Sequence, residues 1–506
     1  MTLTTGILEY VDLVGSAVVT IEPSIVIGIS LGKEAPGATT LTLNGAATLQ
    51  FSSTTIANGN DQVLTVGGTA NLRTGDVGDG GHSNVHLVKN GGTGELILDG
   101  FTSSDMGGAK LSVIAGTMSI EGGGALLSPI STLTTAIEIN GPSGKLRFGT
   151  PTGSVGTTFV RDVLANASGT LEHSTATDDS IGSVTATGQT LTANITAGAL
   201  AVTGTYFGGV IKSGGGTMRL AGTSVLSAAA INAGRLEITG SSATFAAMPS
   251  IASGGTLALL ASTGTAVPGS FSLATGTLEI VQGALGSSPV SLSGGTLRLS
   301  AVGAAPFTNP VTASGNSLID VASGVAKLDT LTLSAGVNLT KAGAGVLELV
   351  GATASTGTTT IGAGTLRIMD GVALPSGAIT DNGVLEIKRT AASTLANAIT
   401  GTGTVTHSGA GMLNLNGAQG YATLNIIAGA GTTNVNGAFT SGTATVNANA
   451  TTNFTVSQKL AALNIGTTAF AGGSSAFQSA PMVVPEPGVL GLLLIGALGG
   501  LSRRRR

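Results

Sequence analysis

One short pattern recurs along this chain: a Gly, a variable residue, and then two apolar residues separated by one residue of any kind. Gly234-Arg235-Leu236-Glu237-Ile238 and Gly364-Thr365-Leu366-Arg367-Ile368 are clear copies. Further copies begin at Gly94, Gly144, Gly216, Gly255, Gly276, Gly295, Gly345, Gly383 and Gly411. Between Gly216 and Gly295, successive copies start 18 to 21 residues apart. A fixed period of this length is typical of solenoid proteins, in which each repeat is one structural unit.

The spacing inside each copy predicts a β-strand. Two apolar residues that are two positions apart share one face of a strand, and the residue between them faces the other way. So short a strand cannot bury its apolar face alone, and a period near 20 is too short for a helical hairpin repeat. We therefore predict an all-β fold, a parallel β-helix of about 20-residue turns. Each turn would hold two or three strands joined at corners where Gly reaches positive φ.

Composition narrows the function classes. Only 9% of the residues are charged, the net charge is -4 and the pI is about 5.6, so no basic surface is available for phosphates. With 3% aromatic residues and no Trp, nucleic-acid bases would have nothing to stack on. The absence of Cys excludes disulfides, thiolate metal sites and a Cys nucleophile. We predict that the protein does not bind nucleic acid.

Most charged residues of the repeat occupy the position between its two apolar residues, which faces outward on a strand. They are Arg219, Glu237, Glu279, Arg298, Glu348, Arg367 and Glu386. Like charges stacked one above the other repel, so their alternation in sign favours pairing between turns. We interpret this column as a solvated face. Asn414, Asn416, Asn434 and Asn436 alternate in the same way and are candidates for stacked external or corner ladders.

One stretch resembles a known family of repeats. It runs Lys341-Ala342-Gly343-Ala344-Gly345-Val346-Leu347-Glu348-Leu349, continues with a Thr-rich strand at 358–361 and ends with Gly-Thr-Leu at 364–366. This order is similar to the autotransporter-associated β-strand repeat, and weaker copies cover 88–120 and 211–238. The resemblance extends loosely over residues 40–450. It implies a β-helix in a bacterial surface or secreted protein.

The C-terminus resembles the PEP-CTERM sorting signal. A Pro-Glu-Pro motif is followed by an uncharged segment at 488–501 and then by a cluster of arginines; the residues are Val484, Pro485, Glu486, Pro487, Arg503, Arg504, Arg505 and Arg506. In that family the signal directs an exported protein to an exosortase, a membrane enzyme that removes it. As a helix, the segment would span about 21 Å, short of a bilayer core of about 30 Å, which suits a transient anchor. The arginines would stay cytoplasmic and leave residues 1–487 outside.

These features predict four parts. Residues 1–40 form an N-terminal segment that starts the solenoid, 41–470 the β-helix, 471–483 a linker and 484–506 the sorting signal with its transmembrane helix. No secretory signal peptide is recognisable at the N-terminus, because no Lys or Arg precedes Lys33 and acidic residues and Pro23 interrupt the apolar residues. We expect the true start to lie upstream, or export to use another route.

Two groups of residues are candidates for a metal site or a catalytic site. His82 and His86 are four residues apart, with Asp76 and Asp79 nearby, as in some metal sites. The segment is rich in Gly, so this spacing does not place both His on one helix face, and we expect an exposed polar loop. It also lacks the periodic pattern of calcium-binding β-rolls.

Asp178 and Asp179, close to His173, form the other group. Enzymes on β-helices need a carboxylate pair or a basic residue in a groove. Two adjacent residues of a strand face opposite sides, so these two Asp would not act together. The remaining candidates, Asp61, Asp162, Asp320 and Asp329, show no mutual spacing. We predict no catalytic site, no metal site and no cofactor.

The sequence therefore predicts a non-enzymatic structural or adhesive protein. The resemblances imply export to the cell surface or extracellular matrix of a Gram-negative bacterium, with transient anchoring in the inner membrane. They also imply an exosortase as a transient partner, and extracellular polysaccharide or other surface components as lasting ones. Two alternatives remain: a carbohydrate-active β-helix enzyme of the lyase or glycosidase type, and a surface-layer protein whose copies pair with one another.

Overall fold

The computed structural model describes most of the repeat region. The described residues are 2–3, 10–12, 18–21, 30–32, 37–43, 48–55, 62–78, 86–99, 110–121, 136–149, 162–261, 265–300, 306–351, 356–373, 376–439 and 442–466. Every regular element in these ranges is a β-strand, and the strands stack in parallel into a solenoid of about 16 turns. The predicted all-β parallel β-helix is thus confirmed. The predicted helix at 488–501 lies outside these ranges, and within them no helix is long and apolar enough to cross a membrane.

The chain divides into two compact units, Met1–Pro289 and Val290–Arg506. The first unit contains β1 (Thr2–Leu3), β2 (Tyr10–Asp12), β3 (Val18–Ile21), β4 (Ser30–Gly32), β5 (Gly37–Leu43), β6 (Thr48–Thr55), β7 (Gln62–Gly68), β8 (Asn71–Gly78), β9 (His86–Lys89), β10 (Glu95–Asp99), β11 (Lys110–Glu121), β12 (Ile137–Phe148), β13 (Val163–Ala165), β14 (Thr170–His173), β15 (Asp179–Ile181), β16 (Val184–Ile195), β17 (Ala199–Val202), β18 (Tyr206–Ser213), β19 (Thr217–Leu220), β20 (Ser224–Ile238), β21 (Ala243–Phe245), β22 (Ser250–Leu259), β23 (Thr265–Ala266), β24 (Phe271–Leu273) and β25 (Thr277–Ile280).

The second unit contains β26 (Val290–Leu292), β27 (Thr296–Leu299), β28 (Val311–Ala313), β29 (Ser317–Asp320), β30 (Val325–Leu328), β31 (Leu331–Leu333), β32 (Leu339–Ala342), β33 (Val346–Leu349), β34 (Thr359–Ile361), β35 (Thr365–Ile368), β36 (Ile379–Asp381), β37 (Val384–Ile387), β38 (Ser393–Leu395), β39 (Ile399–Thr400), β40 (Thr404–His407), β41 (Leu413–Leu415), β42 (Gln419–Gly420), β43 (Thr423–Ile426), β44 (Thr433–Val435), β45 (Thr445–Ala448), β46 (Thr452–Phe454) and β47 (Ala462–Ile465).

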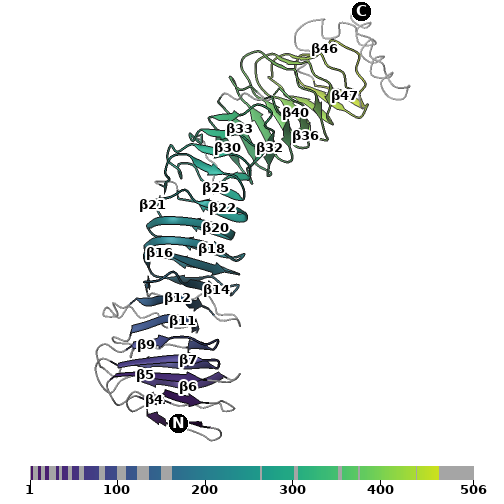
Figure 1. Cartoon of the computed structure of the whole chain (residues 1–506). Helices are drawn as coiled ribbons and strands as arrows, with labels where there is room; N and C mark the ends of the chain where they lie inside the picture. The colour runs from purple at the N-terminus through teal and green to yellow at the C-terminus, as the bar shows by residue number, and fades with distance from the viewer. Residues whose placement is uncertain are drawn as a thin grey trace, which may run out of the picture. The chain divides into compact units, whose positions relative to one another are not determined.

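In the first unit, long strands continue around the corners of the solenoid. The strands β16, β18, β20 and β22 lie one above the other as successive layers (Figure 1). Strand β20 pairs with β18 through its first part and with β19 through its last four residues. Within the pairing with β18 the register shifts between Gly208 and Val210, and the one long strand β20 thus pairs with two successive strands.

In the second unit, several of the described turns have three short strands. Strands β36, β37 and β38 follow one another in one turn, and each belongs to a different sheet. In the sheet that contains β37, Leu385 lies between Leu366 of β35 and Val405 of β40. These partners are 19 and 20 residues from Leu385, which confirms the predicted period.

The apolar residues of the repeat form the core. Leu347, Leu366, Leu385, Val405 and Leu424 stack in register, and each is 0% exposed. Burying one such side chain contributes about 1.5–3 kcal/mol. Since each turn repeats this contribution, the solenoid is held together by one continuous column of aliphatic side chains.

The glycines that begin each copy meet two different requirements. Gly364 has a φ of +66°, as predicted for a corner. Both positions also need space, since an added Cβ would lie 2.3 Å from the carbonyl oxygen of Gly345 at Gly364, and 2.2 Å from that of Ala391 at Gly411. The stacked corners therefore come too close for any side chain at this position.

Candidate functional site

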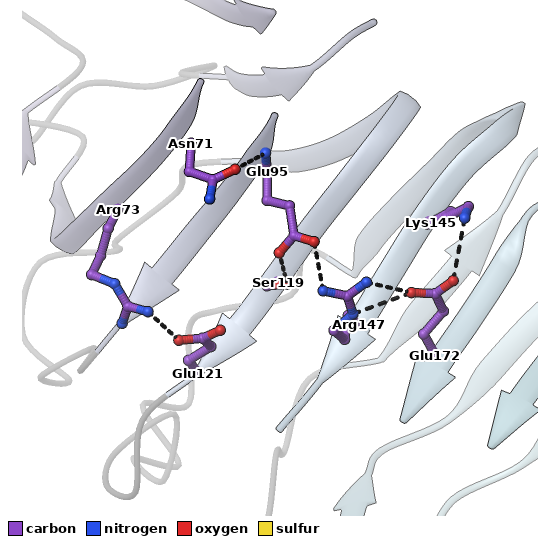
Figure 2. A network of polar contacts seen from close by, with 8 residues as sticks. All are labelled: Asn71, Arg73, Glu95, Ser119, Glu121, Lys145, Arg147 and Glu172. Carbon is purple, nitrogen blue, oxygen red and sulfur yellow. Dashed lines mark hydrogen bonds and ion pairs between the residues drawn. The ribbon is translucent and has the colours of Figure 1, made fainter. Parts of the chain in front are cut away.

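A network of polar contacts lies on the outer face of β8, β10, β11, β12 and β14 in the first unit (Figure 2). At its centre, Arg147 of β12 donates to Glu95 over 2.6 Å and to Glu172 over 2.9 Å. Lys145 lies 3.4 Å from the other carboxylate oxygen of Glu172. Two of these three carboxylate–cation contacts are short, so the carboxylates are held as ion-pair partners.

Arg147 joins strands that are not neighbours. Strand β11 lies between β10, which carries Glu95, and β12. The small side chain of Ser119 on β11 leaves room for the guanidinium to pass, and its hydroxyl donates to Glu95 over 3.2 Å. A second pair, Arg73 with Glu121 at 2.6 Å, flanks this centre (Figure 2). The hydrogen bonds to both carboxylates raise the pKa of Arg147, although burial opposes this.

The same arrangement recurs further along the first unit. Arg235 donates to Glu237 over 2.9 Å and to Glu279 over 2.7 Å, and Ala258 separates these two Glu in the stack. Arg219 adds a third bond to Glu237, at 2.9 Å. Burial alone would raise the pKa of Glu237, but the hydrogen bonds from both arginines outweigh it and lower that pKa.

In the second unit, Arg367 bridges Glu348 at 2.9 Å and Glu386 at 2.7 Å. Charge pairing between turns is therefore confirmed. The interpretation of the column as a solvated face is wrong for its carboxylates, since Glu348 is 5% exposed and Glu237 9%. Neighbouring turns are about 4.8 Å apart, so an arginine side chain covers the carboxylate next to it. Arg298, also predicted in this column, pairs with Asp320 at 2.7 Å.

The closest approach to catalytic geometry lies inside the solenoid. His173 Nε2 is 2.8 Å from Asp179 Oδ2 and 3.0 Å from Thr175 Oγ1, and His173 Nδ1 is 3.0 Å from the carbonyl oxygen of Ala197. Both the His173 and Asp179 side chains are 0% exposed. The Thr hydroxyl and the carboxylate share one ring nitrogen, so Asp179 does not orient the imidazole toward Thr175 from its other side. Asp178 is exposed and lies outside this buried cluster, as the alternation of strand faces predicted.

The other His group is only partly described. His86 opens β9 and is half-buried, so it does not lie in the exposed loop that we expected. Burial and the nearby Lys110 lower its pKa, while Glu138 opposes this. His82 and Asp79 lie outside the described residues, as does the side chain of Asp76.

The scattered acidic residues do not form a site. Asp162 is exposed and accepts a bond from the backbone N–H of Ser183 over 2.6 Å, and Asp329 is exposed in the second unit. Asp61 lies outside the described residues. Within the described ranges, no group of three or more His, Cys, Asp or Glu is placed to hold a metal ion.

The sequence analysis missed a set of buried lysines. Lys89, Lys212 and Lys341 lie at the end of a strand or one residue before it, next to a Gly-rich corner, and each is at most 1% exposed. The ammonium group of Lys341 donates to carbonyl oxygens of two stacked corners: Ala342 at 2.5 Å, Gly343 at 2.8 Å and Ala363 at 3.3 Å. Burial lowers the pKa of Lys212 and Lys341 to about 8. The signal was present, because Lys341 follows the buried Leu339 by two positions and so shares its inward face.

A buried acid occupies the same inward row. Asp381 follows Lys341 and Ile361 in register and is 0% exposed. Its Oδ1 accepts the backbone N–H of Gly383 over 3.0 Å, while Oδ2 has no hydrogen-bond partner. Burial raises the pKa of Asp381 to about 6, although backbone hydrogen bonds oppose this. The hydroxyl of Tyr421 also has no partner, and burial, followed by the charge of Asp381, raises the Tyr421 pKa.

The predicted Asn ladders are confirmed on the second unit. Asn434 Nδ2 donates to Asn414 Oδ1 over 2.7 Å, and Asn436 Nδ2 donates to Asn416 Oδ1 over the same distance. Asn453 extends the first ladder, donating to Asn434 over 2.8 Å. These side chains lie on the outside of the solenoid and have no ion-pair partners.

The predicted sorting-signal residues, 484–487 and 503–506, lie outside the described residues. Comparisons with family models, with curated proteins and with solved structures found no match to this chain. The polar features of the described surface include columns of paired charges and ladders of hydrogen-bonded amides. Neither has the free carboxylate pair that glycoside hydrolysis requires.

Proposed function

We propose that this chain is an exported, non-enzymatic structural or adhesive protein of the bacterial cell surface or extracellular matrix. An exosortase would recognise the segment 484–506 during export, while the apolar helix 488–501 anchors the chain in the inner membrane, and would cleave near Pro487. The mature solenoid would then associate with extracellular polysaccharide or other surface components.

The observation that carries the structural role is the way the outer polar groups are used. Glu95, Glu172 and Glu237 are bound to arginines, and the His173–Asp179 contact is buried. A β-helix enzyme needs accessible acids that change protonation during turnover. A solenoid whose outer charges pair with one another supports a role in scaffolding or adhesion.

Intact mass spectrometry of secreted, surface and inner-membrane fractions of the native host tests the processing. We expect a mature species that lacks the residues after about Pro487. Replacing Pro485, Glu486 and Pro487 together by Ala should leave a full-length chain in the inner membrane. Ser474→Ala, in the predicted linker, is the matched control and should be processed normally. A wild-type chain that still ends in Arg506 in the inner membrane would contradict the proposal.

A further inference from the structure

Two of the hydrogen-bonded side-chain ladders of the second unit form one surface, which we call the amide face. It lies on the outer side of β38, β41, β44 and β46, which pair in parallel in that order. One ladder consists of Thr394, Asn414, Asn434 and Asn453, and the other of Asn416, Asn436 and Thr455. The members of the second ladder follow those of the first by two residues and lie directly after the ends of β41, β44 and β46.

The ladders hold the amide side chains in place but leave some of their hydrogen-bond donors and acceptors unused. An Asn side chain has two N–H donors and a carbonyl oxygen with two lone pairs. Asn434 uses one donor toward Asn414 and accepts one bond from Asn453. One N–H and one lone pair therefore remain in each rung of this kind. A donor and an acceptor side by side match a pair of neighbouring sugar hydroxyl groups.

The amide face is free of charge. From Thr390 to Gln458 the sequence contains no Asp, Glu, Lys or Arg. The one His of this stretch, His407, is buried, and burial lowers its pKa. An anionic polymer would find no counter-charge here, whereas a neutral, hydroxyl-rich polymer would keep its hydrogen bonds without losing hydration of any ion.

The spacing of the rungs selects the form of the ligand. Stacked strands are about 4.8 Å apart. This rise is close to the length of one sugar residue in an extended β-linked glycan, so the sugars and the rungs stay in step over several turns. We propose that the amide face binds an extended neutral polysaccharide that runs along the solenoid axis, with one sugar per turn. The inference rests on the proposed adhesive role and names its ligand class.

Titration calorimetry of the full chain with cello-oligosaccharides tests the spacing. The amide face spans the turns of four paired strands. We expect affinity to rise about tenfold or more from the disaccharide to the tetrasaccharide, and to level off at the hexasaccharide. Binding should not change between low and high salt, because no charge takes part. Affinity that is independent of chain length, or a preference for an acidic polysaccharide, would overturn the inference.

Matched variants locate the site. Asn434→Ala, in the middle of the amide face, should weaken tetrasaccharide binding about tenfold. Asn447→Ala is the control, since Asn447 makes the same kind of rung with Asn464 on a different face. Circular dichroism should show both variants folded. Equal loss of binding in both, or a change in sedimentation of Asn434→Ala that reveals pairing between copies, would overturn the inference.

The outcomes also separate this inference from the proposed function. A chain that is cleaved and exported but binds no cello-oligosaccharide overturns the glycan site and leaves the surface role standing. A full-length chain that stays in the inner membrane yet binds the tetrasaccharide overturns the surface role and leaves the glycan site standing.

Discussion

At the scale of single residues, the interior polar groups are the least expected feature. The alternation that places Leu339 and Ile379 inside also places Lys341 and Asp381 inside, because each follows two positions later. The inward position of Lys341 and Asp381 was therefore predictable from the sequence. The general rule that charged residues face water argued against it. What no pattern could reveal is that corner carbonyl oxygens receive the Lys341 ammonium.

Asp381 should make stability depend on pH in an unusual direction. Its pKa is raised from 3.8 to about 6, so the folded state binds a proton more tightly than the unfolded state. Stability should therefore increase as the pH falls from above 6 to below 4, by about 3 kcal/mol from this group. Urea unfolding of the wild type and of Asp381→Asn at neutral and mildly acidic pH measures this.

The Asn variant cannot titrate, so the difference in unfolding free energy between the two proteins should shift by about this amount over the interval. Thr380→Asn, at the outward neighbour on the same strand, is the control and should follow the wild type. A constant difference between wild type and Asp381→Asn would show that Asp381 keeps an ordinary pKa.

At the scale of elements, the strands were predictable and the corners only partly so. The alternation of Leu385 and Ile387 defines a strand by itself. The corner before it depends on how closely the neighbouring turn approaches, which the sequence of one turn does not contain. Gly364 and Gly411 look identical in the repeat, and both lie too close to the neighbouring turn for a side chain, yet only Gly364 also has a positive φ.

Gly411→Ala should destabilise the second unit by about 1–3 kcal/mol, because the new methyl group would overlap the carbonyl group of Ala391. Gly362→Ala is the matched control. At Gly362 the nearest atom to an added Cβ is the carbonyl oxygen of Lys341, at 3.6 Å, and its φ is not positive. Thermal unfolding followed by circular dichroism compares them, and equal melting temperatures would contradict this account of the corners.

At the scale of the whole molecule, the 20-residue period predicted the solenoid, and the alternation of charge predicted pairing between turns. The partners themselves were not predictable. Glu95 and Arg147 are 52 residues apart, because turns differ in length and one turn is skipped. Such pairs depend on stacking order in space, which the repeat alone does not define.

Arg147→Met tests how much these bridges contribute. Loss of the Arg147 guanidinium group would leave the carboxylates of Glu95 and Glu172 without their shared partner. We expect this to destabilise the fold by about 1 kcal/mol, and by less at high salt. Lys145→Met is the control, since Lys145 is half exposed and lies 3.4 Å from Glu172. Urea unfolding at low and high ionic strength measures both, and a salt-independent loss in Arg147→Met would mean that packing dominates.

The inward row of the second unit has a consequence for how the chain finds its native order. Nearly identical turns invite a folding error in which a turn stacks on the wrong neighbour and the aliphatic core forms anyway. In the inward row, Lys341, Ile361 and Asp381 stack in register and differ from one another, and the buried Tyr421 lies further along the unit. A misplaced turn would bring a buried charge or a large ring against a corner that cannot accommodate it. These residues therefore lower the stability of wrong orders of turns. This directs folding to the native order of turns.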